Sequence, residues 1–299
     1  MVSCVKEVSF KVLIDNQTFS DLESEHGLSI LIETEERSIL CDMGASSAFL
    51  RNAERMGVDL NTIDFAFISH GHSDHTGGLR SFLERYPNKK IFASKHIFNE
   101  YYFSGRSGYW RAMSTDHSLL NDYGDVFQLI DNQQNVGGSN GIWISPKVAI
   151  VSNIHDKWST PFGNKYLTKM ISSEGNSPLQ ADPEYLLSDD FGHELSLVIL
   201  TESGAVIFSS CSHCGAVNII ESCCDFTGES RVRAFVGGLH LVDSPEVVLE
   251  VDNFASELSK RFPETHIFTG HCTSDSAKEL LLKKLNCVEL FYAGCSIAL

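Results

Sequence analysis

The feature that most constrains this chain is a polar stretch at residues 69–78, between an apolar segment and the start of a helical pattern. It places three histidines and one aspartate within six residues, namely His70, His72, Asp74 and His75. Alternate residues of an extended chain share a face, so His70 and His72 can present their imidazoles to one point. As the chain turns into the helix, Asp74 and His75 can face a neighbouring point. Such nitrogen and oxygen ligands suit zinc or another first-row divalent ion, so the stretch predicts two adjacent cation sites rather than a solvated polar loop.

Strand and helix patterns alternate on both sides of this stretch. Expected strands are 8–14, 29–34, 38–42, 65–69, 90–94, 194–200, 205–210, 233–241, 265–269 and 288–293. Expected helices are 46–56, 75–86, 96–103, 216–224, 245–262 and 274–285. Each half of the chain runs from strands to helices, which fits an α/β (α+β) fold with two sheets packed face to face and helices outside. No Pro-rich or Gly/Ser-rich linker separates the halves, so we predict a single domain over residues 1–299.

Two segments without clear periodicity interrupt this pattern, at 104–124 and 155–192. Both are long for loops in a compact domain, and loops of this length are often lids or binding loops. The second segment also contains aromatic residues, namely Trp158, Phe162, Tyr166, Tyr185 and Phe191. A lid over the site and a loosely ordered surface insertion are the two interpretations that the sequence leaves open.

The composition limits the classes of partner. The chain has 23 Lys plus Arg against 39 Asp plus Glu, a net charge of −16, and its only basic runs are 89–90 and 283–284, so no nucleic-acid-binding surface is expected. No apolar run approaches the ~18–20 residues of a membrane span, and charged residues interrupt the N-terminal region where a signal peptide needs an apolar stretch. Nine irregularly spaced cysteines suit a reducing compartment better than a disulfide framework. We therefore expect a cytoplasmic protein that acts on a small molecule, without nucleic acid or membrane as a partner.

The pattern His-x-His-x-Asp-His at residues 70–75 resembles the signature of the metallo-β-lactamase superfamily. Five further segments are similar to a narrower branch, which contains the archaeal dihydropterin-ribofuranosylaminobenzene phosphate synthase. They are EHGLS at 25–29, LCDMG at 40–44, SCSHCG at 210–215 running to Asn218, GGLHL at 237–241 and GHCT at 270–273. The resemblance spans nearly the whole chain. It implies a metallo-β-lactamase fold, a four-layer αββα sandwich with the metals at one edge of the two sheets.

The resemblance also implies a set of metal ligands. His70, His72 and His213 would hold the first metal ion, and Asp74, His75 and His271 would hold the second. The two later histidines, His213 and His271, follow the apolar strands expected at 205–210 and 265–269. A sheet edge would bring such strand ends to a common place.

The chain departs from the superfamily at the position that bridges the two metals. Much of the superfamily has Gly-Asp there, whereas this chain has Ser210, Cys211, Ser212 and His213, without an aspartate. A Cys211 thiolate, His213 itself or solvent are the alternatives for the bridge. Asp42, at the end of the strand 38–42, is expected to lie behind the ligands, where it would accept a hydrogen bond from a ligand histidine and fix its tautomer.

These features predict a metal-dependent hydrolase. Two divalent ions, with zinc expected and manganese or iron as alternatives, lower the pKa of a shared water to about 7. The metal-bound hydroxide would attack an ester, thioester, amide or phosphoester. Asp74 would also accept a proton, and His240, with His26 as the second choice, would protonate the leaving group. His240 is alternatively a further metal ligand.

Two other functions are compatible with the same motifs. One is a metal-dependent transferase that acts on a phosphorylated pterin-like or ribosyl substrate. It would need a basic pocket, for which the candidates are Lys95, Arg106, Arg111, Lys157, Lys165 and Lys169. The other is a non-hydrolytic di-iron redox protein or a metal sensor.

Overall fold

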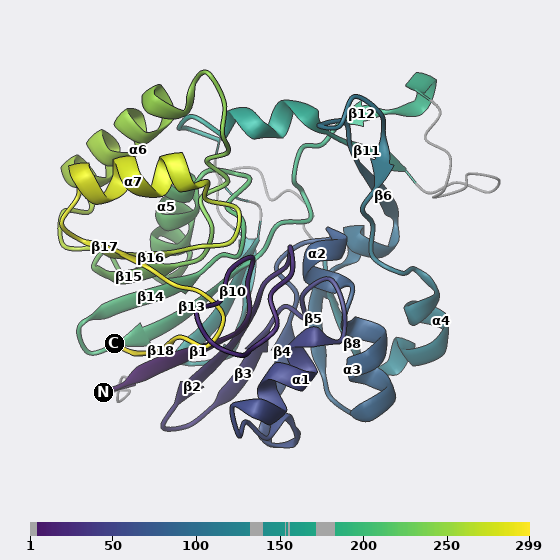
Figure 1. Ribbon diagram of the computed structural model, residues 1–299. Helices are drawn as coiled ribbons and strands as arrows, with labels where there is room; N and C mark the ends of the chain where they lie inside the picture. Colours follow the sequence, from purple (N-terminus) through teal and green to yellow (C-terminus); the bar gives the residue numbers. More distant parts are fainter. Residues whose placement is uncertain (1–4, 132–139, 153, 155, 172–182) are drawn as a thin grey trace.

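Two seven-stranded sheets pack face to face in the structure, a computed structural model that describes residues 5–131, 140–152, 154, 156–171 and 183–299 (Figure 1). The first sheet has the order β18-β1-β2-β3-β4-β5-β8, and the second has the order β17-β16-β15-β14-β13-β10-β9. Strands of the first sheet are β1 (Val8–Ile14), β2 (Ser29–Thr34), β3 (Ser38–Cys41), β4 (Phe65–Phe67), β5 (Ile91–Ser94), β8 (Phe127–Ile130) and β18 (Ser296–Ala298). Strands of the second are β9 (Asn140–Ser145), β10 (Val148–Ser152), β13 (Ser196–Thr201), β14 (Gly204–Phe208), β15 (Val232–Val236), β16 (His266–Thr269) and β17 (Val288–Leu290).

Side chains of the central strands alternate between two cores. In β3, Ile39 faces the core between the sheets and Leu40 faces the core under the helices. In β14, Val206 faces the core between the sheets and Ile207 faces the core under the helices. Strands that bury both faces need nearly continuous apolar sequence, which is the pattern of these segments.

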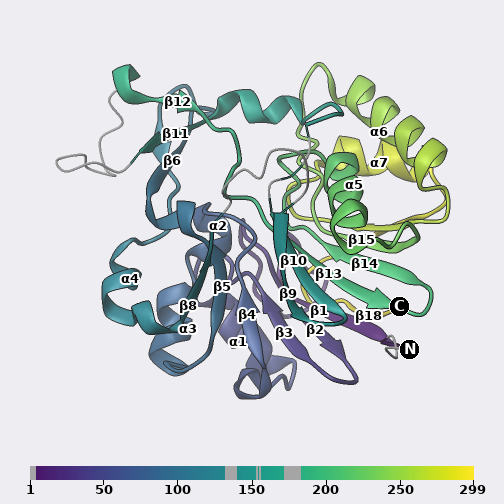
Figure 2. The same cartoon turned by 180° about the vertical axis from the view of Figure 1, so that it is seen from behind.

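Helices cover the outer face of each sheet (Figures 1 and 2). The first sheet is covered by α1 (Ala48–Arg55), α3 (Leu79–Arg85) and α4 (Ser118–Tyr123). The second is covered by α5 (Ala216–Thr227), α6 (Val247–Arg261) and α7 (Asp275–Lys284). This arrangement confirms the predicted four-layer αββα sandwich. The described residues form no helix that is both long and apolar enough to cross a membrane.

A third sheet, with four strands in the order β12-β11-β6-β7, stands at one edge of the sandwich (Figure 1). Its strands are β6 (Glu100–Ser104), β7 (Arg111–Ala112), β11 (Leu167–Ile171) and β12 (Leu187–Ser188). β6 pairs antiparallel with β11, so this sheet joins the two irregular segments of the sequence. Residues 155 and 172–182 of the second segment lie outside the described residues.

The prediction of a helix at 96–103 is wrong. A short 3-10 helix ends at Phe98 and β6 follows, because Tyr102 and Phe103 pair with Lys169 and Thr168 of β11. The distant strand overrides the local helical pattern. The 3-10 helices are η1 (Leu60–Thr62), η2 (Lys95–Phe98), η3 (Gly124–Val126), η4 (Phe162–Tyr166) and η5 (Pro183–Tyr185).

Two other expected elements are interrupted at glycines. The helix expected at 75–86 divides into α2 (Ser73–Thr76) and α3, because the chain at Gly78 presses against the backbone. A Cβ atom there would lie 2.1 Å from the carbonyl oxygen of Met43. The strand expected at 233–241 ends at Val236, because Gly237 has a φ of +149° and turns the chain toward the site.

The chain end also differs from expectation. The last expected strand, 288–293, is shortened to β17, and β18 follows it and pairs antiparallel with β1. The strands β8, β9 and β10 were not predicted either.

Candidate metal centre

The carboxyl ends of parallel strands from both sheets meet at the upper edge of the sandwich, close to α2 (Figure 1). These strand ends carry five of the predicted side chains: Asp42 after β3, His70 after β4, His213 after β14, His240 after β15 and His271 after β16. Asp42, His240 and His271 have φ values of +57°, +50° and +48°. Such left-handed backbone costs a non-glycine residue of order 1 kcal/mol and tends to occur at functional sites.

The first group of candidate ligands is His70, His72 and His213, whose ligand atoms lie within 4.8 Å of one another. Burial lowers the pKa of each imidazole, so the rings are neutral at pH 7. In the described part of the chain, the Nε2 atoms of His70 and His213 are buried without a hydrogen-bond partner, and that of His72 lies 3.6 Å from a carboxylate oxygen of Asp189. Leaving a buried polar atom unpaired costs ~1–3 kcal/mol, and a cation among the three rings would remove this cost. The three imidazoles therefore fit a zinc-like ion.

The second group is Asp74, His75 and His271. Oδ2 of Asp74 lies 3.5 Å from Nε2 of His75 and 3.5 Å from Nε2 of His271, and the two nitrogens are 3.0 Å apart. Burial would lower the pKa of His75, but the charges of Asp74 and Asp42 outweigh it and raise the pKa to about 10. An electric field that holds a proton on this ring also favours a divalent cation in its place.

Asp42 orients one ligand in each group. Its Oδ2 accepts hydrogen bonds from Nδ1 of His75, at 2.8 Å, and from Oγ of Ser69, at 2.6 Å. Because the Ser69 hydroxyl donates to Asp42, its oxygen accepts from Nδ1 of His70, at 2.8 Å. Both histidines therefore carry the proton on Nδ1 and present the Nε2 lone pair to the site.

Two asparagines orient His271 and His213 in the same way. Oδ1 of Asn16 lies 3.0 Å from Nδ1 of His271, and Oδ1 of Asn164 lies 3.2 Å from Nδ1 of His213. Each amide nitrogen also donates to the backbone oxygen of the same histidine. Neither asparagine is among the site residues predicted from the sequence. Asn16 follows a predicted strand, which is a usable signal, whereas Asn164 lies in an irregular segment that offers none.

A buried histidine and aspartate behind His72 were also missed. The Gly71 amide donates to Nδ1 of His193, at 3.0 Å, so Nε2 of His193 carries the proton that faces Oδ2 of Asp189, at 3.1 Å. The same Oδ2 lies 3.6 Å from Nε2 of His72. Burial opposes ionisation of Asp189, but His193 and His72 lower its pKa. A carboxylate in this place favours a proton on Nε2 of His72 and a lone pair on Nδ1.

Cys211 lies between the two groups, at the place where this chain lacks the aspartate of the superfamily pattern. Its Sγ atom is within 4.8 Å of ligand atoms of His70 and His75, and also of His213 and His240. Sγ is 3.2 Å from Nε2 of His75. Burial raises the pKa of this thiol well above its usual range, so a thiolate here needs an adjacent cation.

The remaining two predicted residues lie at the margin of the groups. His26 accepts a hydrogen bond from Nδ2 of Asn16 at its Nδ1, and its Nε2 lies 3.4 Å from Oδ2 of Asp74. His240 lies beside Cys211 and His213, and its Nε2 is 2.7 Å from a guanidinium nitrogen of Arg106.

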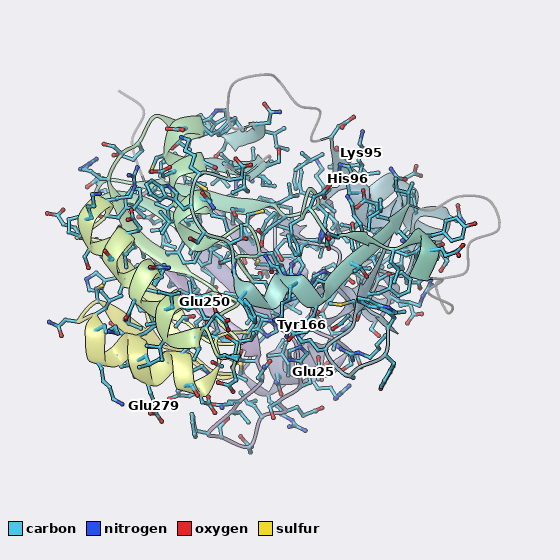
Figure 3. All side chains as sticks on the ribbon, turned by 90° about the horizontal axis from the view of Figure 1, so that it is seen from above. Glu25, Lys95, His96, Tyr166, Glu250 and Glu279 are labelled. Atoms are coloured by element: carbon cyan, nitrogen blue, oxygen red, sulfur yellow. The ribbon has the colours of Figure 1, made fainter. Side chains whose placement is uncertain are left out.

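Access to the groups is restricted to one side. The side chains of His75 and His271 are fully buried, whereas those of Asp74 and His26 are 15% and 60% exposed. The 3-10 helix η4 crosses the middle of this face, and Figure 3 shows Tyr166, its last residue, with Glu250 nearby. The Phe162 amide donates to Oε1 of Glu250, at 2.6 Å, which fastens η4 to α6.

Comparison with known proteins gives consistent results for family and fold. Residues 24–153 match the family model of the Metallo-beta-lactamase superfamily. A curated relative in Methanocaldococcus jannaschii is 7,8-dihydropterin-6-methyl-4-(beta-D-ribofuranosyl)-aminobenzene-5'-phosphate synthase, 28% identical over 87% of this chain and 85% of its own length. An uncharacterized protein of the same archaeon is 26% identical over 95% of this chain and 96% of its length.

A solved structure resembles the whole chain. The crystal structure of Tm1679, described as a metal-dependent hydrolase of the beta-lactamase superfamily, has a TM-score of 0.74 and 25% identity. The match covers 97% of this chain and 98% of that one.

Proposed function

Because the chain carries a metallo-beta-lactamase superfamily domain, we propose that it is a metal-dependent hydrolase acting on a small molecule. The bond cleaved would be an ester, thioester, amide or phosphoester. The observation that carries the proposal is the pair of buried, neutral ring nitrogens without a partner, on His70 and His213, next to His72 and the Asp74 group.

His70, His72 and His213 would hold one divalent ion, and Asp74, His75 and His271 a second. Nitrogen-rich sets of this kind suit zinc, and manganese and iron are the alternatives that elemental analysis separates. When bound, two such ions supply a nucleophile at neutral pH and polarise the bond under attack.

Three side chains of this protein would handle protons and orientation. Asp74 is the partly exposed member of its group, and its Oδ2 can accept a proton from the attacking water. The Nε2–H of His26 points at that oxygen and holds the carboxylate in place. Nδ1 of His240 is buried without a hydrogen-bond partner among the described residues, and burial lowers the pKa of this ring, so the neutral imidazole can donate a hydrogen bond to the leaving group.

Transfer rather than hydrolysis is the second candidate, because the first of the archaeal relatives is a synthase. Three of the six cations considered for a phosphate pocket, Lys95, Lys157 and Lys169, are paired with carboxylates. Arg106, Arg111 and Lys165 have no such partner among the described residues, so they remain available for a substrate.

Metal analysis combined with a substrate screen tests the proposal. Protein purified without added metal should contain two zinc, manganese or iron ions per chain, and it should cleave one class among phosphodiesters, thioesters and lactones. Cleavage should be lost in His72→Ala and Asp74→Ala, with the fold retained by circular dichroism. His266→Ala, an exposed histidine at the opposite end of β16, is the matched control and should keep full activity. Activity in either site variant would refute the site assignment, and metal-loaded protein without any cleavage would favour transfer.

A further inference from the structure

Arg106 is unusual among the arginines of this acidic chain because no carboxylate pairs with it. Seven of the arginines form ion pairs, namely Arg37, Arg51, Arg55, Arg80, Arg85, Arg231 and Arg261. Among the described residues, no ion pair is formed by the other three, Arg106, Arg111 and Arg233. Two of these three, Arg106 and Arg111, lie on the β6–β7 hairpin beside the metal centre.

The one hydrogen bond recorded for Arg106 within the described part of the chain goes to His240. A guanidinium nitrogen lies 2.7 Å from Nε2 of His240. A guanidinium has five N–H donors and no acceptor, so Nε2 must be the acceptor and the ring proton must reside on Nδ1. Nδ1 is buried and has no hydrogen-bond partner in the described residues. This tautomer makes His240 an N–H donor and not a metal ligand.

The Arg106–His240 pair is enclosed on one side and free on the other. A Cβ atom on Gly163 of η4 would lie 3.0 Å from the Arg106 guanidinium and 3.1 Å from the His240 ring, so η4 packs directly on the pair. The remaining donors of Arg106 have no acceptor in the described protein. Arg111 adds positive charge near the site, where it contributes to a lowered pKa of His26.

Arg106 is exposed, so the donors that His240 leaves unused face solvent beside the candidate metal centre, where an anionic group can replace water with charge-assisted hydrogen bonds. We propose that Arg106 binds an oxyanion group of the substrate, a carboxylate or a phosphate, beside the bond that is cleaved. Through the same side chain it sets His240 as the donor to the substrate oxygen. This inference rests on the proposed function, and it narrows the substrate to anionic small molecules.

Calorimetric titration of the metal-loaded protein with inorganic phosphate in one arm and succinate in the other tests the inference without turnover. Arg106→Gln should weaken binding of at least one anion by tenfold or more, with metal content and unfolding temperature unchanged. Arg106→Lys should restore part of it, because the charge remains but the planar fork is lost. Arg233→Gln, which removes an unpaired arginine of β15 bonded to Ser203, is the matched control and should bind both anions normally.

The titration in which Arg106→Gln loses affinity identifies the anionic group of the substrate. A loss confined to phosphate indicates a phosphorylated substrate, and a loss confined to succinate indicates a carboxylate. Equal binding of both anions by the unaltered protein and by Arg106→Gln would overturn the inference. Such a result would leave the proposed hydrolase function intact. Conversely, a purified protein without bound metal would refute the proposed function but not the role of Arg106. In that case, phosphate titration of the metal-free protein still tests Arg106.

Discussion

Replacing Asp42 by Asn should weaken both metal sites at once, although Asp42 contacts neither ion site directly. Its Oδ2 accepts from His75 and from the Ser69 hydroxyl, and its Oδ1 accepts from the Ser69 amide, at 2.8 Å. In Asp42→Asn, an amide NH₂ at the Oδ2 position would face the Nδ1–H of His75. That ring would shift its proton to Nε2, and the reoriented Ser69 hydroxyl would force the same shift on His70.

The magnitude follows from the number of ligands affected. Loss of a partner that orients a metal-bound histidine typically costs roughly 10–100-fold in metal affinity. This corresponds to about 1.4–2.7 kcal/mol for each ion. Rotating the amide does not avoid the loss, because the NH₂ group would then face the Ser69 amide donor.

Two variants make the test sharp. Ser69→Ala removes the branch to His70 and leaves the contact between Asp42 and His75, so it should weaken one ion only. Asp64→Asn, which alters a carboxylate bonded to the Ser38 amide at the start of β3, should weaken neither. Competition of each metal-free protein with a chromophoric zinc chelator measures both binding constants. If Asp42→Asn bound both metal ions with the affinities of the wild type, the tautomer argument would be refuted.

Three further perturbations have defined outcomes. His271→Ala should reduce bound metal toward one ion per chain by elemental analysis, and unchanged stoichiometry would remove His271 from the ligand set. Asp189→Asn should lower zinc affinity about tenfold in the same chelator competition, because Nε2 of His72 loses the carboxylate that favours its proton, and an unaltered affinity would exclude that role. Burial raises the pKa of Asp15 to about 6, so the folded state binds this proton more tightly than the unfolded state does. Its contribution to stability is full below about pH 3.9, is lost as the pH rises through 6, and amounts to roughly 3 kcal/mol over that interval. The unfolding free energy of wild type relative to Asp15→Asn should therefore fall between pH 4 and 7, and a constant difference in denaturant titrations would contradict the burial effect.

Most helices and the central strands of the two large sheets could be predicted because local patterns determine them, and parallel strand ends placed His70 and His271 at one edge. Contacts between distant segments could not be predicted in the same way. Asn164 is 49 positions from the histidine that it holds, and its segment has no period. Asp189 faces His193 and also His72, a candidate ligand in the first half of the chain. Such contacts depend on the third sheet, whose pairing is absent from any local pattern.

The pairing of β18 with β1 bears on how the protein is made. The Leu299 amide donates to the carbonyl of Val8, and the Val12 amide donates to that of Cys295. The first strand of the chain therefore lies beside the last. During translation, the first sheet keeps an open edge until residues 296–298 have been synthesised. The candidate ligands are also spread from position 70 to position 271, so the first group is complete only when His213 has been synthesised and the second only when His271 has been synthesised. We expect metal loading and closure of the sandwich to be late events in biosynthesis, after most of the chain has left the ribosome.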